Sequence, residues 1–151
     1  MKAITWLAAI TLSAAVTTTA LAGPSEGWTA DYKAALAQAK KENKSVLLEF
    51  TGSDWCPPCK FMAKNVFTKK AFVEAASKKY VLVKLDFPRA DKALAEKNKP
   101  LAEKYEIQGY PTIVLTDANG KEFTRVVGAK YKTVDEFLGW INKSANQKDL
   151  D

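Results

Sequence analysis

The sequence predicts an α/β fold in which a central mixed β-sheet lies between layers of helices. Helical and strand patterns alternate along the chain, the strand patterns are short and largely apolar, and an Asn-Gly turn separates the last two of them. Strands joined through a helix can pair in parallel, whereas strands joined by a tight turn pair antiparallel. The order of the patterns therefore predicts one mixed sheet with helices on both faces.

The first predicted elements are a helix between Thr29 and Asn43 and a strand from Ser45 to Phe50. Apolar residues recur at helical spacing in the helix, and in the strand they are nearly continuous. A continuous apolar run is typical of a strand that is buried on both faces. The helix precedes this strand, so the fold is expected to carry an extra N-terminal helix.

A second helix is expected to begin at the two cysteines, to break near Thr68 and to resume from Ala71 to about Lys78. Met62 and Val66 share one face of this helix. Tyr80 to Phe87 is the next apolar run and predicts a second buried strand.

The segment from Pro88 to Tyr105 is rich in Lys, Ala and Glu and is expected to be helical in pieces, because Pro100 interrupts it. Within it, the stretch from Pro88 to Lys99 combines four basic with two acidic residues, namely Arg89, Lys92, Lys97 and Lys99 with Asp91 and Glu96. This mixture favours a solvated helical face over a contact with a partner.

Two β-rich runs, Thr112 to Thr116 and Glu122 to Val127, are joined by a turn that contains Asn119-Gly120 and predict a hairpin. A last helix is expected to follow the capping-box pattern at Thr133. The tail from Lys143 onward is expected to be loose.

Composition excludes several classes of catalyst. The 151 residues include no histidine, which removes Ser-His-Asp and Cys-His nucleophile systems, HExxH zinc sites and imidazole bases. The 23 basic and 17 acidic residues give a formal charge of +6. The lysines are scattered and form no aromatic-and-basic motif, so nucleic acid is not an expected partner.

Residues 1–22 have the pattern of a signal peptide. A single charge at Lys2 precedes an apolar stretch, and Ala20-Leu21-Ala22 fits a small-x-small cleavage site. Cleavage near Ala22 would release one domain of residues 23–151 into the periplasm or the medium. An uncleaved membrane anchor is the alternative, although the Thr17-Thr18-Thr19 run weakens it. Export would place the cysteines in an oxidising compartment.

Cys56 and Cys59 are the only cysteines and stand three positions apart, in Trp55-Cys56-Pro57-Pro58-Cys59-Lys60. The motif lies between a buried strand and a helix, so Cys56 is expected to be accessible at a helix start, where the helix dipole favours a thiolate. Lys60 adds positive charge, whereas the two prolines remove N–H donors that could have bonded the sulfur. These opposing effects leave the direction of the thiol pKa open.

Three uses of this cysteine pair can be compared. A disulfide that closes so short a loop stabilises a fold by only about 2 kcal/mol in the chain-entropy model, which makes a purely structural bridge a weak explanation. Two thiolates without histidine or a second cysteine pair do not complete a zinc site, although copper(I) can bind two sulfurs. No resident metal or cofactor is expected. Redox chemistry of a Cys56–Cys59 disulfide is the favoured interpretation.

Several stretches of the chain resemble the thioredoxin superfamily, in particular its exported thiol-disulfide proteins. Val46 to Phe50 followed by the Cys-Pro-Pro-Cys motif resembles the family's central strand and active-site turn. Gly109-Tyr110-Pro111-Thr112 resembles its cis-proline loop, and Val127-Gly128-Ala129 resembles the glycine segment of its substrate groove. The resemblance covers essentially all of residues 23–151 and implies a thioredoxin fold.

The resemblance also implies roles for single residues. Cys56 would be the attacking cysteine, Cys59 the resolving one, and Pro111 would carry a cis peptide bond that faces the disulfide. Trp55 and Tyr110, together with Gly128, would line the surface that meets a substrate protein.

Glu49 interrupts the apolar strand before the active-site turn, where an unpaired carboxylate is expensive to bury and its pKa should rise. In the family a buried Asp at the matching position assists proton transfer to and from the resolving cysteine. Lys84 matches a lysine that neighbours this carboxylate in the family and could lower its pKa again. Solvation at a strand edge is the alternative for both residues.

Together these features predict a monomeric thiol-disulfide oxidoreductase that exchanges disulfides with exported proteins, with the reductase direction favoured. A reductase of this kind would need an electron donor, which we expect to be linked to the inner membrane. The alternatives are a non-enzymatic thioredoxin-like protein-binding module, whose groove around Trp55 and Tyr110 holds a partner, and a copper(I)-binding protein.

Overall fold

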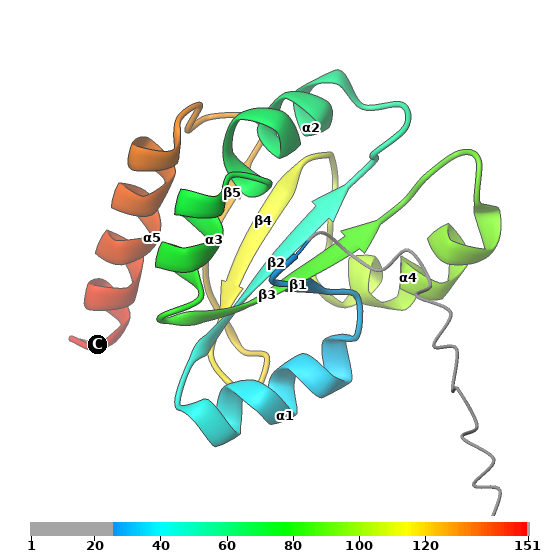
Figure 1. The fold of residues 1–151 in the computed structure, drawn as a ribbon. Helices are drawn as coiled ribbons and strands as arrows, with labels where there is room; N and C mark the ends of the chain where they lie inside the picture. Colours follow the sequence, from blue (N-terminus) through cyan, green and yellow to red (C-terminus); the bar gives the residue numbers. More distant parts are fainter. Residues whose placement is uncertain (1–25, 151) are drawn as a thin grey trace, which may run out of the picture.

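The computed structural model describes residues 26–150 and shows one five-stranded sheet between two layers of helices (Figure 1). The predicted signal peptide, residues 1–22, lies outside the described residues. In chain order the elements are β1 (Trp28–Thr29), α1 (Tyr32–Glu42), β2 (Ser45–Thr51), α2 (Pro57–Met62), the π-helical turn η1 (Ala63–Phe67), α3 (Lys70–Ala76), β3 (Tyr80–Asp86), α4 (Lys92–Lys104), β4 (Thr112–Thr116), β5 (Glu122–Val127) and α5 (Val134–Lys148).

The strands lie in the order β1-β3-β2-β4-β5, which places β2 at the centre of the sheet. β1, β3 and β2 are parallel, whereas β4 pairs antiparallel with β2 and β5 pairs antiparallel with β4. This is the thioredoxin fold that the resemblance implied. The active-site turn follows the carboxyl end of β2, at the same edge of the sheet as the end of β3.

The side chains of β2 alternate between two hydrophobic cores, as the two faces of a strand require. Val46, Leu48 and Phe50 pack on one face with residues of α1 and α4. Leu47 packs on the other face with α2, α3 and α5. In Figure 1, α1 lies on one side of the sheet, and α2, α3 and α5 lie on the other. Glu49 shares its face with Leu47 and therefore points toward the helices that follow the cysteines.

Side-chain caps mark the starts of α1 and α5. The Asp31 side chain caps α1 and accepts a hydrogen bond from the Ala34 N–H, and Asn43 ends this helix at φ +52°. Thr133 forms the expected capping box at the start of α5. The hairpin turn ends at Gly120, whose φ of +79° is accessible to glycine at little cost.

The structure differs from the sequence prediction in four places. α4 runs without a break from Lys92 to Lys104 with Pro100 inside it, so the expected interruption is wrong. α5 continues to Lys148, so the tail is not loose up to that residue. Ala145 contributes to this result, because it packs against the hydrophobic core. The π-helical turn and the short β1 were not predicted, and β1 depends on pairing with the distant strand β3.

Within residues 26–150 we find no helix that combines the length and the apolar character needed to span a bilayer.

Candidate active site

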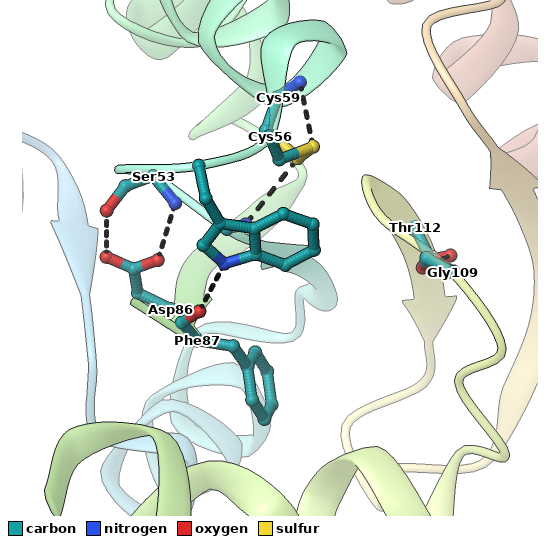
Figure 2. The surroundings of a disulfide bond; sticks show 9 residues. Ser53, Cys56, Cys59, Asp86, Phe87, Gly109 and Thr112 are labelled. Carbon is teal, nitrogen blue, oxygen red and sulfur yellow. Dashed lines mark hydrogen bonds between the residues drawn. A yellow bond between two sulfur atoms is a disulfide. The ribbon is translucent and has the colours of Figure 1, made fainter. Parts of the chain in front are cut away.

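Cys56 and Cys59 form a disulfide at the start of α2, with their Cα atoms 5.2 Å apart (Figure 2). Cys56 is the N-cap of α2, and Pro57 and Pro58 occupy the first helical positions. Because the two prolines have no N–H, the first free amide of the helix is that of Cys59, which donates to the Cys56 Sγ at 3.3 Å. The helix start thus offers a single backbone donor to this sulfur.

Both sulfurs lie inside the protein in this oxidised form. Cys56 exposes 3% of its surface and Cys59 1%, so both residues are buried in the disulfide state, and the accessibility of the reduced Cys56 thiol stays a prediction. The cause is local, because capping turns the Cys56 side chain back over the first helical turn. The Cys59 Sγ points further inward and accepts a hydrogen bond from the Gly52 N–H at 3.5 Å.

The last residue of β3 and the residues that follow it hold the active-site turn by hydrogen bonds. The bonds involve three consecutive residues of the turn, Ser53, Asp54 and Trp55. The Ser53 N–H and hydroxyl both donate to the Asp86 carboxylate (Figure 2). Asp54 accepts hydrogen bonds from the N–H groups of Arg89 and Ala90 at 3.0 and 2.8 Å. These bonds fix the turn that carries the disulfide against the end of a buried strand.

Trp55 completes this attachment. Its indole Nε1–H donates to the Phe87 carbonyl at 2.8 Å, and its ring meets Tyr110 edge to face, with centroids 5.6 Å apart. The Tyr110 ring also lies 5.2 Å from the ring of Phe87. Three separate segments, namely the active-site turn, the end of β3 and the proline loop, therefore meet in one aromatic cluster of Trp55, Phe87 and Tyr110.

The proline loop lies beside this cluster. The Tyr110–Pro111 peptide bond is cis, as the resemblance implied. The Gly128 N–H donates to the Pro111 carbonyl at 2.8 Å, which ties the end of β5 to the loop. Gly128 has φ +77°, and a methyl group at its Cα would meet no atom within 4 Å. The surface beside Pro111 is consequently open at Gly128.

Glu49 is the buried carboxylate of the site. It exposes 2% of its surface, and its Oε1 has no hydrogen-bond partner. Burial raises the pKa of Glu49 to about 7, while the charge of Lys84 and the Thr51 side chain act in the opposite direction. Asp86, as a second negative charge, raises this pKa further.

Lys84 stands opposite Glu49 in the β2–β3 register. Within residues 26–150 the Glu49 carboxylate and the Lys84 ammonium group do not form an ion pair. Lys84 is half-buried and acts on Glu49 through its charge. The strand-edge solvation that was the alternative for Glu49 is therefore wrong, because β2 is the central strand.

The family follows from comparison of the sequence with known proteins. A model of the thioredoxin-like domain matches residues 32–145. The chain belongs to the thioredoxin-like family. It is 35% identical over 98 residues to the disulfide bond reductase DsbH of Chlamydia pneumoniae, an alignment that covers 63% of this chain and 59% of that protein.

Two further similarities of this thioredoxin-like chain are to Dsb proteins. It is 30% identical over 102 residues to the thiol:disulfide interchange protein DsbD of Haemophilus ducreyi, which covers 68% of this chain and 17% of DsbD. The solved structure of a DsbH oxidoreductase matches with a TM-score of 0.70 and 28% identity over 84% of this chain and 89% of that one. The chain spans about three fifths of the C. pneumoniae DsbH sequence and about one sixth of DsbD.

The thioredoxin-like site also contains residues that the sequence did not single out. Ser53, Asp54, Asp86, Phe87 and Arg89 fix the active-site turn. Two signals in the sequence could have pointed to them, namely the polar turn before Trp55 and the acidic residue that closes the second buried strand. Within residues 26–150 no group of three or more Cys, Asp or Glu side chains is placed to hold a metal ion.

Proposed function

We propose that this chain is a thiol-disulfide oxidoreductase that cycles between a Cys56–Cys59 disulfide and two thiols. The observation that carries the proposal is the disulfide at a helix start, directly after Trp55, whose ring packs against Tyr110 of the cis-proline loop. The similarity to DsbH and DsbD supports the same chemistry. A disulfide that spans so few residues stabilises the fold by only about 2 kcal/mol in the chain-entropy model, which favours a redox role over a purely structural one.

In the proposed cycle the reduced protein transfers two electrons and two protons to a partner disulfide. The Cys56 thiolate attacks one partner sulfur, a mixed disulfide forms, and the other partner sulfur leaves as a thiolate that takes up a proton. The Cys59 thiolate then attacks the Cys56 Sγ, the second partner sulfur leaves as a thiolate and is protonated, and the Cys56–Cys59 disulfide is restored. An external dithiol must reduce this disulfide before the next turnover.

Glu49 is proposed to accept the Cys59 proton before the second attack. The carboxylate lies on the face of β2 that packs against α2, and its pKa of about 7 suits proton exchange near neutral pH. Lys84 is proposed to keep that pKa from rising further. Trp55, Tyr110 and Gly128 form the proposed surface for the partner, with Pro111 beside the sulfurs.

The reductase direction is proposed because DsbH carries the name of a disulfide bond reductase. The proposed partners are the thiols and disulfides of exported proteins, and the proposed donor is a dithiol linked to the inner membrane. Both assignments rest on the similarity to Dsb proteins and on the signal-peptide pattern of residues 1–22, which predicts export to the periplasm or the medium. The exported protein is proposed to be a monomer.

A trapping experiment tests the proposal. Cys59→Ser should accumulate mixed disulfides with exported proteins, and Cys56→Ser, the matched control, should trap none. The wild-type protein should reduce insulin faster than free dithiol does at equal thiol concentration. If Cys59→Ser traps nothing and insulin reduction shows no acceleration, the chain is a binding module or a copper(I) protein instead. The equilibrium of the Cys56–Cys59 pair with glutathione then measures its reduction potential, which gives the direction of the reaction. Reductants of this kind have potentials of about −270 mV and oxidants of about −120 mV.

A further inference from the structure

The acidic side chains around the active-site turn differ from the basic ones in whether they have hydrogen-bond or ion-pair partners within the protein. Asp54 accepts two backbone N–H bonds, Asp86 binds Ser53, and Asp91 caps α4 through the Leu94 N–H. The hydrogen-bonding capacity of these carboxylates is therefore directed into the protein. The cations of the same region, Arg89 and Lys60, form no ion pair within residues 26–150.

Arg89 contacts two residues of the active-site turn, Asp54 and Trp55, of which Trp55 directly precedes Cys56. Its backbone N–H is held by Asp54, one residue before Trp55, and its guanidinium carbon lies 5.0 Å from the centroid of the Trp55 ring. Stacking on an indole leaves the N–H groups at the edge of a guanidinium free for an acceptor. Arg89 is exposed, so those donors are open to solvent and to a partner.

Lys60 extends the positive charge along the same rim. It directly follows Cys59, it is exposed, and its charge is near enough to contribute to the lowered pKa of Asp54. Asp54 lies near the Lys60 charge and contacts the backbone of Arg89, and each of its oxygens already accepts a backbone N–H. An incoming carboxylate would meet free cationic donors at this rim.

We propose that Arg89 determines specificity by binding a carboxylate that lies close to the reactive cysteine of the partner protein. The proposal rests on the oxidoreductase function proposed above and defines its substrates as proteins with an Asp or Glu beside the exchanging disulfide. Guanidinium and carboxylate can form two parallel hydrogen bonds, and the stacked Trp55 ring keeps the guanidinium oriented for them.

The test uses three disulfide-linked peptides that are identical except for two residues beside one cysteine, which are Glu, Gln or Lys. Stopped-flow fluorescence measures the second-order rate at which the reduced protein cleaves each peptide. The wild-type protein should cleave the Glu peptide about threefold faster than the Gln peptide, because an exposed charge pair contributes modestly. The Lys peptide should be the slowest, and high salt should reduce the differences.

Variants assign the preference to one side chain. Arg89→Gln should cleave the Glu and Gln peptides at equal rates, Arg89→Glu should favour the Lys peptide, and Arg89→Lys should keep part of the preference for Glu. Lys40→Gln is the matched control, because it removes one exposed positive charge from α1 and should leave the preference unchanged. Thermal unfolding of each variant verifies that the fold is intact.

The outcomes separate this inference from the function on which it rests. If all three peptides are cleaved at equal rates, or if Arg89→Gln keeps the wild-type preference, the role of Arg89 is wrong while the oxidoreductase function stands. If no peptide is cleaved by the reduced protein, both proposals fall.

Discussion

Two carboxylates flank the active-site turn and differ in what surrounds them. Glu49 is buried, one of its oxygens has no partner, and burial raises its pKa to about 7. Asp54 is exposed, and the N–H groups of Arg89 and Ala90 hold its pKa below the usual value. The comparison teaches that donors and solvent, rather than the type of side chain, decide which carboxylate can exchange a proton near neutral pH and which stays ionised.

The largest expected effect is that of Glu49→Gln on the resolving step. Without an acceptor for the Cys59 proton, release of the partner from the mixed disulfide should slow by about 100-fold at pH 7, the lower range for loss of a general base. Stopped-flow release from a preformed mixed disulfide measures this rate. The rate of the variant should recover at high pH, where hydroxide deprotonates the thiol directly.

A conservative change at an exposed carboxylate serves as the control. Glu74→Gln on α3 should release the partner at the wild-type rate. A Glu49→Gln protein with an unchanged rate and pH profile would remove Glu49 from the proposed mechanism.

Stability should fall with rising pH because of Glu49. The carboxyl has a pKa of about 7 when folded against a model value of 4.5, so the folded state binds the extra proton between these values. The Glu49 contribution to the free energy of unfolding is therefore fully present below pH 4.5 and is lost as pH rises through about 7. This loss amounts to about 3 kcal/mol in total. Urea unfolding of the oxidised protein at pH 5 and pH 8 measures the change. Glu49→Gln should remove this contribution, and a wild-type curve parallel to that of the variant would contradict the buried, unpartnered carboxyl.

Removal of the Lys84 charge should affect the resolving step less than the Glu49→Gln change does. Lys84 lowers the pKa of Glu49, so Lys84→Met should raise that pKa and move the pH profile of the resolving step to higher pH. Lys78→Met, which removes an exposed lysine after α3, should not shift the profile. Equal profiles for Lys84→Met and the wild type would mean that the lysine charge is screened from the carboxyl.

The smallest effect is expected at Asp54. Asp54→Ala leaves two backbone N–H groups to solvent, so the segment after β3 should hold Trp55 less firmly and peptide cleavage should slow by about threefold. Exchange of the Trp55 indole N–H, followed by NMR, should become faster. Asp135→Ala in the first turn of α5 is the control and should change neither measurement.

Much of the fold could be predicted because local pattern and tertiary environment agree. The alternation of Val46, Leu47 and Leu48 between two cores is what a central strand requires, and the cysteine motif identified both the turn and the start of α2. Pro100 shows where local rules fail. The helix α4 continues through this proline, with the neighbouring Asn98 side chain anchored to the Asp86 carbonyl.

The attachment of the active-site turn could not be predicted, because it joins residues more than 30 positions apart. Ser53 and Asp86 are an ordinary turn residue and an ordinary strand end in the sequence, and only the parallel register of β2 and β3 brings them together. The burial of Cys56 was missed for a related reason, since the rotamer that caps α2 is chosen by the folded turn.

Hydrogen bonds to Ser53, Asp54 and Trp55 hold the active-site turn firmly against the end of β3 and the residues after it. A surface held by five hydrogen bonds changes little when a partner chain binds. Most of the conformational entropy lost on association is therefore lost by the partner. For the proposed oxidoreductase function, this rigidity predicts that disulfides in flexible segments of a partner are reduced faster than disulfides in stiff loops.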